Sequence, residues 1–148
     1  MPNDERFKPY AAVYLVLVKD GQVLLSKRCN TGYQDGNYSL VAGHLDGGET
    51  TKQGIIREAK EEANVTINPS DLEVIHVMHR FRPDREYIDF YLKAEKWLGD
   101  IKNLEPNKCS ELKWYNLNNL PENMAPEVRL ALENLNKNIF FSELGWEI

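Results

Sequence analysis

A β-hairpin near the start of the chain restricts the fold more than any other feature. Residues 11–18 (AAVYLVLV) form an apolar run with the composition of a strand. Asp20 and Gly21 follow this run, and Asp-Gly is a preferred centre for a two-residue hairpin turn. Residues 22–28 then have the composition of the returning strand. An antiparallel pair at this place predicts a sheet that is not purely parallel.

The remaining pattern adds further strands and two helices. Strands are predicted over residues 38–42, 72–82, 87–96 and 111–117, helices over about 51–63 and 126–138, and a loop over 29–37. Thr50 and Gln53 have the spacing of a capping box, and Asn64 tolerates the left-handed conformation that ends many helices. Strands on both sides of the early helix, with a late helix to cover the other face, predict a three-layer α/β/α sandwich with a mixed sheet.

Length and composition are typical of one globular domain spanning residues 1–148. The chain is 42% hydrophobic and 28% charged, which excludes disordered and collagen-like classes. Its two cysteines, Cys29 and Cys109, are too few for a disulfide-rich secreted domain or a Cys-rich zinc site. The amino-terminal residues are charged, and no run approaches the ~18 apolar residues of a membrane span. We therefore expect a cytoplasmic protein without a membrane partner.

The charge balance indicates which partners to expect. A net charge of −5 argues against a protein that binds nucleic acid through general basic character. A phosphate-bearing small substrate remains compatible with this charge, because bound divalent cations can reverse the local charge of an acidic site.

Three glutamates share one side of the early helix. Glu58, Glu61 and Glu62 fall within a sector of about 100° beside an apolar stripe. Like charges four residues apart cost a few tenths of a kcal/mol, roughly, and the helix dipole disfavours anions near its C-terminal end. A helix that keeps three carboxylates together despite this repulsion favours a bound cation, and clustered hard oxygen ligands suit Mg²⁺ or Mn²⁺. A solvated charged face without a metal is the alternative that the helix alone leaves open.

The spacing around this helix resembles the Nudix box of the Nudix hydrolases, the MutT-like pyrophosphohydrolases. The box pattern is filled, over residues 43–65, by Gly43, Glu49, Arg57, Glu58, Ala59, Glu61 and Glu62. Asn64 stands where the family places a glycine, a departure that leaves the metal ligands untouched. The resemblance covers nearly the whole chain and implies a single Nudix-type α/β/α domain.

The resemblance also implies a metal site. Glu58 and Glu62 are expected to be the principal ligands, Glu61 a further ligand, and the Gly43 carbonyl oxygen a backbone ligand. The expected cofactor is Mg²⁺, with Mn²⁺ as its substitute. Either Glu61 or Glu58 is expected to act as the general base.

Other residues receive weaker predictions. Glu49 and Arg57 resemble an ion pair that fixes the loop against the helix. Glu111, near the closing strand, is either an added ligand or base, or an ordinary exposed strand residue. Arg28 and His44 are candidates for substrate contact, although a lone arginine at a strand end is usually just exposed.

A second basic group lies in the segment FRPDRE, which carries Arg80, Arg82 and Arg85. These arginines either bind phosphate or balance nearby acids.

The function that the resemblance implies is metal-dependent hydrolysis of a phosphoanhydride in a nucleoside diphosphate linked to another group. A (deoxy)nucleoside triphosphate, oxidised or not, giving monophosphate and pyrophosphate, is the first expectation. Dinucleoside polyphosphates, nucleotide sugars and ADP-ribose remain open. The rivals are a nucleotide-sensing module that does not cleave its ligand and an isoprenyl diphosphate isomerase, which would need Cys29 or Cys109 in the pocket. Dimers are frequent in the family, so the resemblance is also compatible with a homodimer.

Overall fold

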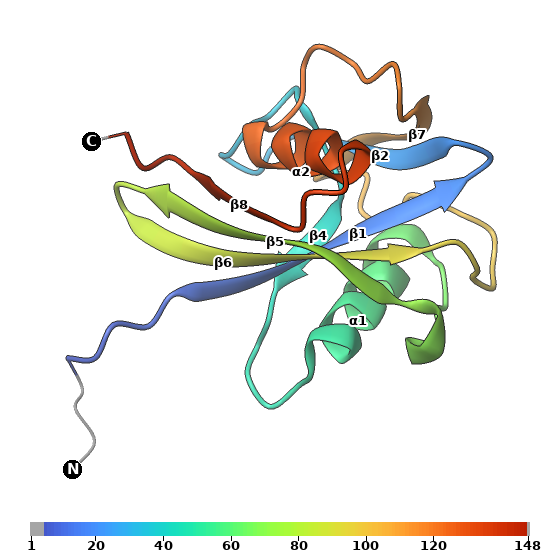
Figure 1. Ribbon diagram of the computed structural model, residues 1–148. Helices are drawn as coiled ribbons and strands as arrows, with labels where there is room; N and C mark the ends of the chain where they lie inside the picture. The colour runs from blue at the N-terminus through green and yellow to red at the C-terminus, as the bar shows by residue number, and fades with distance from the viewer. Residues whose placement is uncertain (1–4, 148) are drawn as a thin grey trace.

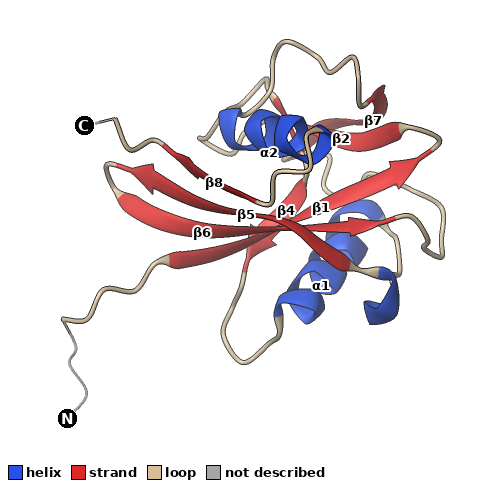
Figure 2. Cartoon of the chain, in the orientation of Figure 1, coloured by secondary structure: helices blue, strands red, loops and turns tan. Residues whose placement is uncertain are grey.

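The structure, a computed structural model, describes residues 5–147, so residues 1–4 and 148 of the predicted domain lie outside the described part. The elements are β1 (Tyr10–Lys19), β2 (Gln22–Arg28), β3 (Tyr38–Ser39), β4 (Val41–His44), α1 (Thr51–Ala63), the 3₁₀ turn η1 (Pro69–Asp71), β5 (Glu73–Arg82), β6 (Arg85–Ala94), β7 (Cys109–Asn116), α2 (Pro126–Asn136) and β8 (Phe141–Leu144). Figure 1 and Figure 2 show α1 and α2 on opposite sides of the sheet.

The predicted hairpin is present. Strands β1 and β2 pair antiparallel, with Lys19 opposite Gln22. Asp20 and Gly21 both have positive φ, 53° and 75°, as a type I′ turn requires. The turn residues therefore fix the register of the first strand pair.

The sheet has eight strands and is mixed, as predicted. Its main order is β3-β2-β1-β6-β5-β8, with β4 paired to β1 and β7 paired to β2. β1 runs parallel to β6, and β5 runs parallel to β8, whereas the other pairs are antiparallel. β1 therefore lies in the middle of the sheet and joins the strands that surround the candidate site.

Alternate residues of β1 enter two cores. Val13 and Leu15 pack on the α1 side, together with Ile55 of the helix. Tyr14 and Val16 pack on the α2 side, where Val128 belongs to the same cluster. This alternation follows from the two-residue repeat of a strand and confirms the three-layer α/β/α architecture.

The predicted strand over residues 38–42 is wrong in one respect. The chain forms two short strands: β3 pairs with β2, and β4 pairs with β1. The chain changes its partner strand at Leu40, which is buried among side chains on the α2 side. The switch carries Gly43 and His44 to the edge of the sheet beside α1.

The other element predictions hold within a few residues, and two short elements, η1 and β8, were not predicted. Helix α1 has the predicted capping box at Thr50 and Gln53, and Asn64 ends it with φ 63°. Strand β8 has no counterpart in the prediction, because it is four residues long and two of its side chains are exposed. Within residues 5–147, no helix is both long and apolar enough to cross a membrane.

Candidate active site

The end of β4 lies directly against the carboxylate side of α1. Gly43 is in such close contact with Glu58 that a Cβ at residue 43 would overlap the Glu58 carboxyl group. Only glycine allows the helix carboxylate and the strand backbone to approach this closely. The structure therefore brings together two of the predicted ligands, Gly43 and Glu58.

Arg57 holds the loop and the glutamates in place. Its guanidinium forms a two-pronged contact with Glu49, with Nε–Oε1 and Nη2–Oε2 distances of 3.1 and 2.9 Å. Its Nη1 donates to Glu58 at 2.7 Å and lies 3.7 Å from Glu61. Among the described residues, no three acidic, imidazole or thiol groups converge on one point. The expected Glu49–Arg57 ion pair is thus present, and Arg57 neutralises part of the glutamate charge.

Glu62 is the most perturbed acid of this group. Burial, together with a hydrogen bond to Glu58 and the charge of Glu58, raises the pKa of Glu62 to about 10. One carboxyl oxygen, Oε2, is buried and has no hydrogen-bond partner. A buried carboxyl pair with an unsatisfied oxygen is costly, and a divalent cation relieves that cost with the hard oxygen ligands it prefers. The donor set fits the implied metal.

Glu61 and Glu105 complete the acidic surroundings. The Glu61 side chain is 52% exposed and is the most accessible of the three helix glutamates. Glu105 was not predicted from the sequence; its charge also raises the pKa of Glu62. The loop that carries Glu105 packs on the end of α1, where the backbone N–H groups of Lys102 and Leu104 donate to the carbonyl oxygens of Ala63 and Glu62 at 3.0 and 3.1 Å.

Glu111 is not brought to this group. The Tyr38 hydroxyl donates to Glu111 at 2.6 Å, and Tyr38 belongs to the core on the α2 side. Its neighbour Leu112 packs with the α1 side, so the two-residue repeat of β7 points Glu111 away from the helix glutamates. This placement does not support the predicted role of Glu111 as a ligand or base.

A cavity of about 480 Å³ adjoins the glutamate group. Gly43 and His44 form part of its wall, and the rest comes from β1, β2, β3, β5, β6, α2 and the loop over residues 29–37. Both predicted substrate-contact residues, Arg28 and His44, line it. Neither Cys29 nor Cys109 is among its lining residues. The volume is in the usual range for a small-molecule site.

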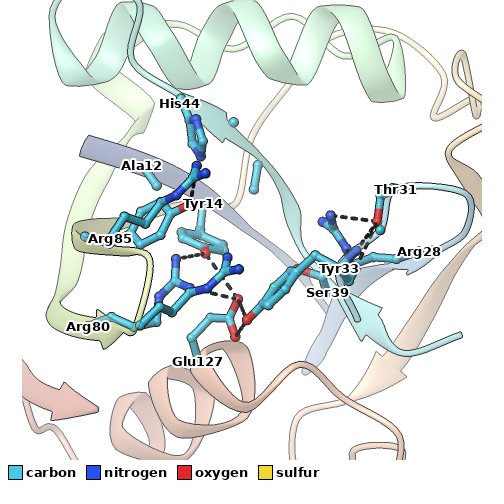
Figure 3. Close-up of a pocket in the computed structure, with 15 residues that line it drawn as sticks. Ala12, Tyr14, Arg28, Thr31, Tyr33, Ser39, His44, Arg80, Arg85 and Glu127 are labelled. Carbon is cyan, nitrogen blue, oxygen red and sulfur yellow. Dashed lines mark hydrogen bonds and ion pairs between the residues drawn. The ribbon is translucent and has the colours of Figure 1, made fainter. Parts of the chain in front are cut away.

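One lining residue, Arg80, belongs to a buried ion pair. Arg80 donates to Asp89 from Nε and Nη2 at 2.7 and 3.2 Å, and Nη2 also donates to the Tyr14 hydroxyl at 3.2 Å. Nη1 of Arg80 has no hydrogen-bond partner and lies 3.8 Å from Glu127, which receives a hydrogen bond from Tyr33 at 2.9 Å. The cavity thus ends in a free N–H donor next to a carboxylate (Figure 3).

His44 lies on the side of the cavity nearest to α1. Its ring is 5.6 Å from both Tyr10 and Tyr87, centroid to centroid. Burial lowers the pKa of His44, and the nearby charge of Arg85 lowers it further. A neutral His44 near pH 7 can donate or accept a hydrogen bond at the mouth of the cavity.

Comparisons with known proteins identify the family. A sequence model of the NUDIX domain matches residues 6–135. The chain is 29% identical over 114 residues to an ADP-ribose pyrophosphatase of Methanocaldococcus jannaschii, covering 77% of this chain and 66% of that protein. It is 27% identical over 119 residues to the NAD-capped RNA hydrolase NudC of Shigella dysenteriae, covering 79% of this chain and 44% of that protein. The chain thus spans less than two thirds of the length of these relatives.

Solved structures show the same fold. A MutT NUDIX hydrolase from Burkholderia pseudomallei superposes with a TM-score of 0.79 at 24% identity, covering 86% of this chain and 98% of that one. A MutT protein from Methanosarcina mazei superposes with a TM-score of 0.75 at 21% identity, covering 88% and 95% of the two chains. With a domain match over most of its length, this chain belongs to the Nudix family.

Proposed function

We propose that this protein is a metal-dependent pyrophosphohydrolase that cleaves a nucleoside diphosphate linked to another group. The observation that carries the proposal is the hydrogen-bonded Glu58–Glu62 pair: the Glu58 carboxyl lies against Gly43 at the wall of an arginine-lined cavity, and Glu62 keeps a buried oxygen without a hydrogen-bond partner. Names of the relatives, pyrophosphatase and NAD-capped RNA hydrolase, support the same reaction class.

The metal would be held by carboxylates of α1. Glu58 and Glu62 supply the principal ligands, the Gly43 carbonyl oxygen a backbone ligand, and Glu61 a further one. Mg²⁺, or Mn²⁺ in its place, neutralises phosphate charge and orients the attacking water when bound. Glu105 is added to this set, because its charge already acts on Glu62.

Other side chains position the glutamates, accept the proton of the attacking water and bind the phosphate. Arg57 positions Glu58 through the 2.7 Å contact and ties the preceding loop to the helix through Glu49. Glu61 or Glu58 takes the proton of the attacking water; Glu61 is the better placed of the two to exchange that proton with solvent, since half of its side chain is exposed. His44 and Arg85 face the cavity and would bind the phosphate oxygens.

Two classes of nucleotide are the leading candidates for the substrate. The resemblance to MutT-like enzymes favours a (deoxy)nucleoside triphosphate, and the named activities of the relatives favour ADP-ribose and NAD-linked substrates. Both classes contain the nucleoside diphosphate that the reaction requires. We further propose that the protein acts in the cytoplasm, as one domain, on a small nucleotide. A homodimer belongs to the same proposal.

The rivals predict other outcomes. A nucleotide sensor would bind without turnover, although it would have no need of a complete set of box carboxylates. The isomerase needs a reactive cysteine at the substrate, and neither Cys29 nor Cys109 lines the cavity.

The decisive experiment measures phosphate and pyrophosphate release from a nucleotide panel with Mg²⁺. The panel contains canonical and 8-oxo triphosphates, ADP-ribose, NADH, a nucleotide sugar and a dinucleoside tetraphosphate. Glu62→Gln should reduce turnover at least ~100-fold and EDTA should abolish it, since one metal ligand is removed. Glu73→Gln, at an exposed glutamate of β5, is the matched control and should retain wild-type rates. Nucleotide binding without turnover of any member would refute the hydrolase and favour the sensor.

A further inference from the structure

The turn between β5 and β6 places two arginines next to each other at the cavity. Arg82 and Arg85 are the last opposed pair of this antiparallel ladder, and Pro83 and Asp84 form the turn that joins them. Both arginines line the cavity, and Figure 3 shows Arg85 beside His44. The pair therefore belongs to the side of the cavity where the diphosphate is expected.

A single carboxylate bridges the two arginines. Positive side chains opposite each other in a sheet repel, so an anion next to both of them stabilises the arrangement. Asp84 supplies this anion: Oδ1 lies 3.3 Å from Nε of Arg82, and Oδ2 lies 3.1 Å from Nε of Arg85. Each carboxylate oxygen thus contacts one guanidinium, which is how two oxygens of a phosphate group would contact the same pair.

Asp84 is not needed to orient the arginines. The Arg82 guanidinium lies over the Tyr33 ring, 4.7 Å from its centre, and the Arg85 guanidinium lies over the Tyr10 ring at 4.5 Å. Stacking on an aromatic ring restricts the direction of a guanidinium without using its hydrogen-bond donors. Removing the carboxylate should therefore leave both arginines near their present positions, with one negative charge fewer beside them.

The contacts of Asp84 are weak enough for a ligand to replace. The Asp84 side chain is 48% exposed, and those of Arg82 and Arg85 are 32% and 36% exposed. Water screens ion pairs at such positions, so each one contributes little. A phosphate group has more negative charge and more acceptor oxygens than a carboxylate, and its contacts with arginine are the stronger ones. Asp84 is not among the lining residues of the cavity, so its departure leaves the cavity wall intact.

We propose that Asp84 is an internal competitor of the substrate: its carboxylate bridges Arg82 and Arg85 until a phosphate of the diphosphate takes its place. The proposal rests on the proposed function only in assuming that the diphosphate lies at the Gly43 side. Binding then includes the loss of two ion pairs, so Asp84 lowers the affinity of the cavity for phosphate ligands. The two roles that the sequence left open for these arginines, phosphate binding and balance of an acid, are the two states of one exchange.

The test measures binding without turnover. Calorimetry with Mg²⁺ uses imidodiphosphate, a diphosphate with nitrogen in place of the bridging oxygen and no base that the cavity must accept. We expect Asp84→Asn to bind it roughly three- to tenfold tighter than the wild type, the range that two exposed ion pairs imply. Arg82→Gln and Arg85→Gln should each weaken binding. Asp84→Asn should add a smaller gain to either of them, and little or none when both arginines are replaced.

Two further variants control for charge and for folding. Asp20→Asn removes the same charge from the turn of the other hairpin, at an exposed residue outside the cavity lining, where asparagine also suits the positive φ. It should leave the affinity for imidodiphosphate unchanged. Asp84→Ser repeats the neutralisation with another residue that turns favour, and should show the same gain as Asp84→Asn.

The outcomes separate this proposal from the hydrolase, because no readout uses turnover. Unchanged or weaker binding in Asp84→Asn would overturn the proposal and show that the carboxylate positions the arginines for the ligand. An equal gain in Asp20→Asn, a gain that survives replacement of both arginines, or no binding by either the wild type or Asp84→Asn would also overturn it, whether or not the protein is a hydrolase. The expected gain in a protein that hydrolyses nothing would support the role of Asp84 and refute the hydrolase.

Discussion

Replacing Glu62 by glutamine should stabilise the metal-free protein at neutral and alkaline pH. The pKa of Glu62 rises from 4.5 to about 10 on folding, chiefly because the carboxyl is buried. The native state therefore keeps a proton that the unfolded chain releases above pH 4.5. The contribution of Glu62 to the free energy of unfolding is therefore fully present below pH 4.5. It falls by about 1.4 kcal/mol per pH unit as the pH rises toward 10.

Glutamine keeps the shape of the side chain and cannot ionise. In EDTA the Glu62→Gln protein should lack this slope and exceed the free energy of unfolding of the wild type by about 5 kcal/mol at pH 8, while the two should be similar near pH 4.5. Mg²⁺ should narrow the difference, because ionised carboxylates bind the metal and bound metal stabilises the wild type by about 2.7 kcal/mol at a hundredfold excess over Kd.

Urea unfolding at half-unit pH intervals from 5 to 9, with EDTA and with Mg²⁺, measures both effects. Glu73→Gln serves as the control, because Glu73 is an exposed residue of β5 and its loss should leave the slope unchanged. A wild-type slope in Glu62→Gln, or a variant less stable than wild type at pH 8 in EDTA, would refute the assignment of a buried protonated carboxyl.

Three further predictions follow from the same contacts. Gly43→Ala should fold but lose at least ~100-fold in hydrolysis rate and most Mg²⁺ affinity, because its Cβ would displace the Glu58 carboxyl; unchanged metal affinity would argue against this contact. Asp89→Asn should lower the free energy of unfolding by about 3–5 kcal/mol, since it leaves the buried Arg80 with only the 3.8 Å contact to Glu127 as an ion pair. A loss below roughly 1 kcal/mol would contradict that reasoning. Burial lowers the pKa of His76, so the wild type should lose stability as pH falls below about 6.5, and His76→Gln should lose less; equal acid sensitivity in urea titrations would count against a neutral native His76.

Local signals carried most of the fold prediction. The Asp20–Gly21 turn, the capping box at Thr50 and the left-handed Asn64 depend on neighbouring residues, and the sequence contains all that decides them. The exchange of strand partners at Leu40 depends on which strands flank β1 in space. A short apolar run does not contain that information.

The candidate site divides in the same way. The box residues lie within one strand end, one loop and one helix, and the family resemblance that they carry implied that Gly43 and Glu58 share one site. Glu111 and Glu105 depend on the register of β7 and on the packing of a loop against the end of α1, which are tertiary properties. The sequence likewise indicated Arg28 as a candidate without showing that Arg82 lies near it, because only the folded sheet brings both arginines to the Tyr33 ring.

The folded chain keeps its two kinds of charge on opposite sides of one strand end. Gly43 contacts Glu58 on the helix side and also lines the cavity that contains the arginines. A diphosphate at Gly43 would lie between the metal-loaded glutamates of α1 and the arginines of the cavity wall, and each side would neutralise part of its negative charge. This arrangement explains how a chain of net charge −5 can accept a polyanion: the positive charge it needs is concentrated where the ligand binds rather than spread over the surface. It also explains why the arginines come from strands and the carboxylates from a helix, since only the sheet can gather side chains so far apart in sequence around one cavity.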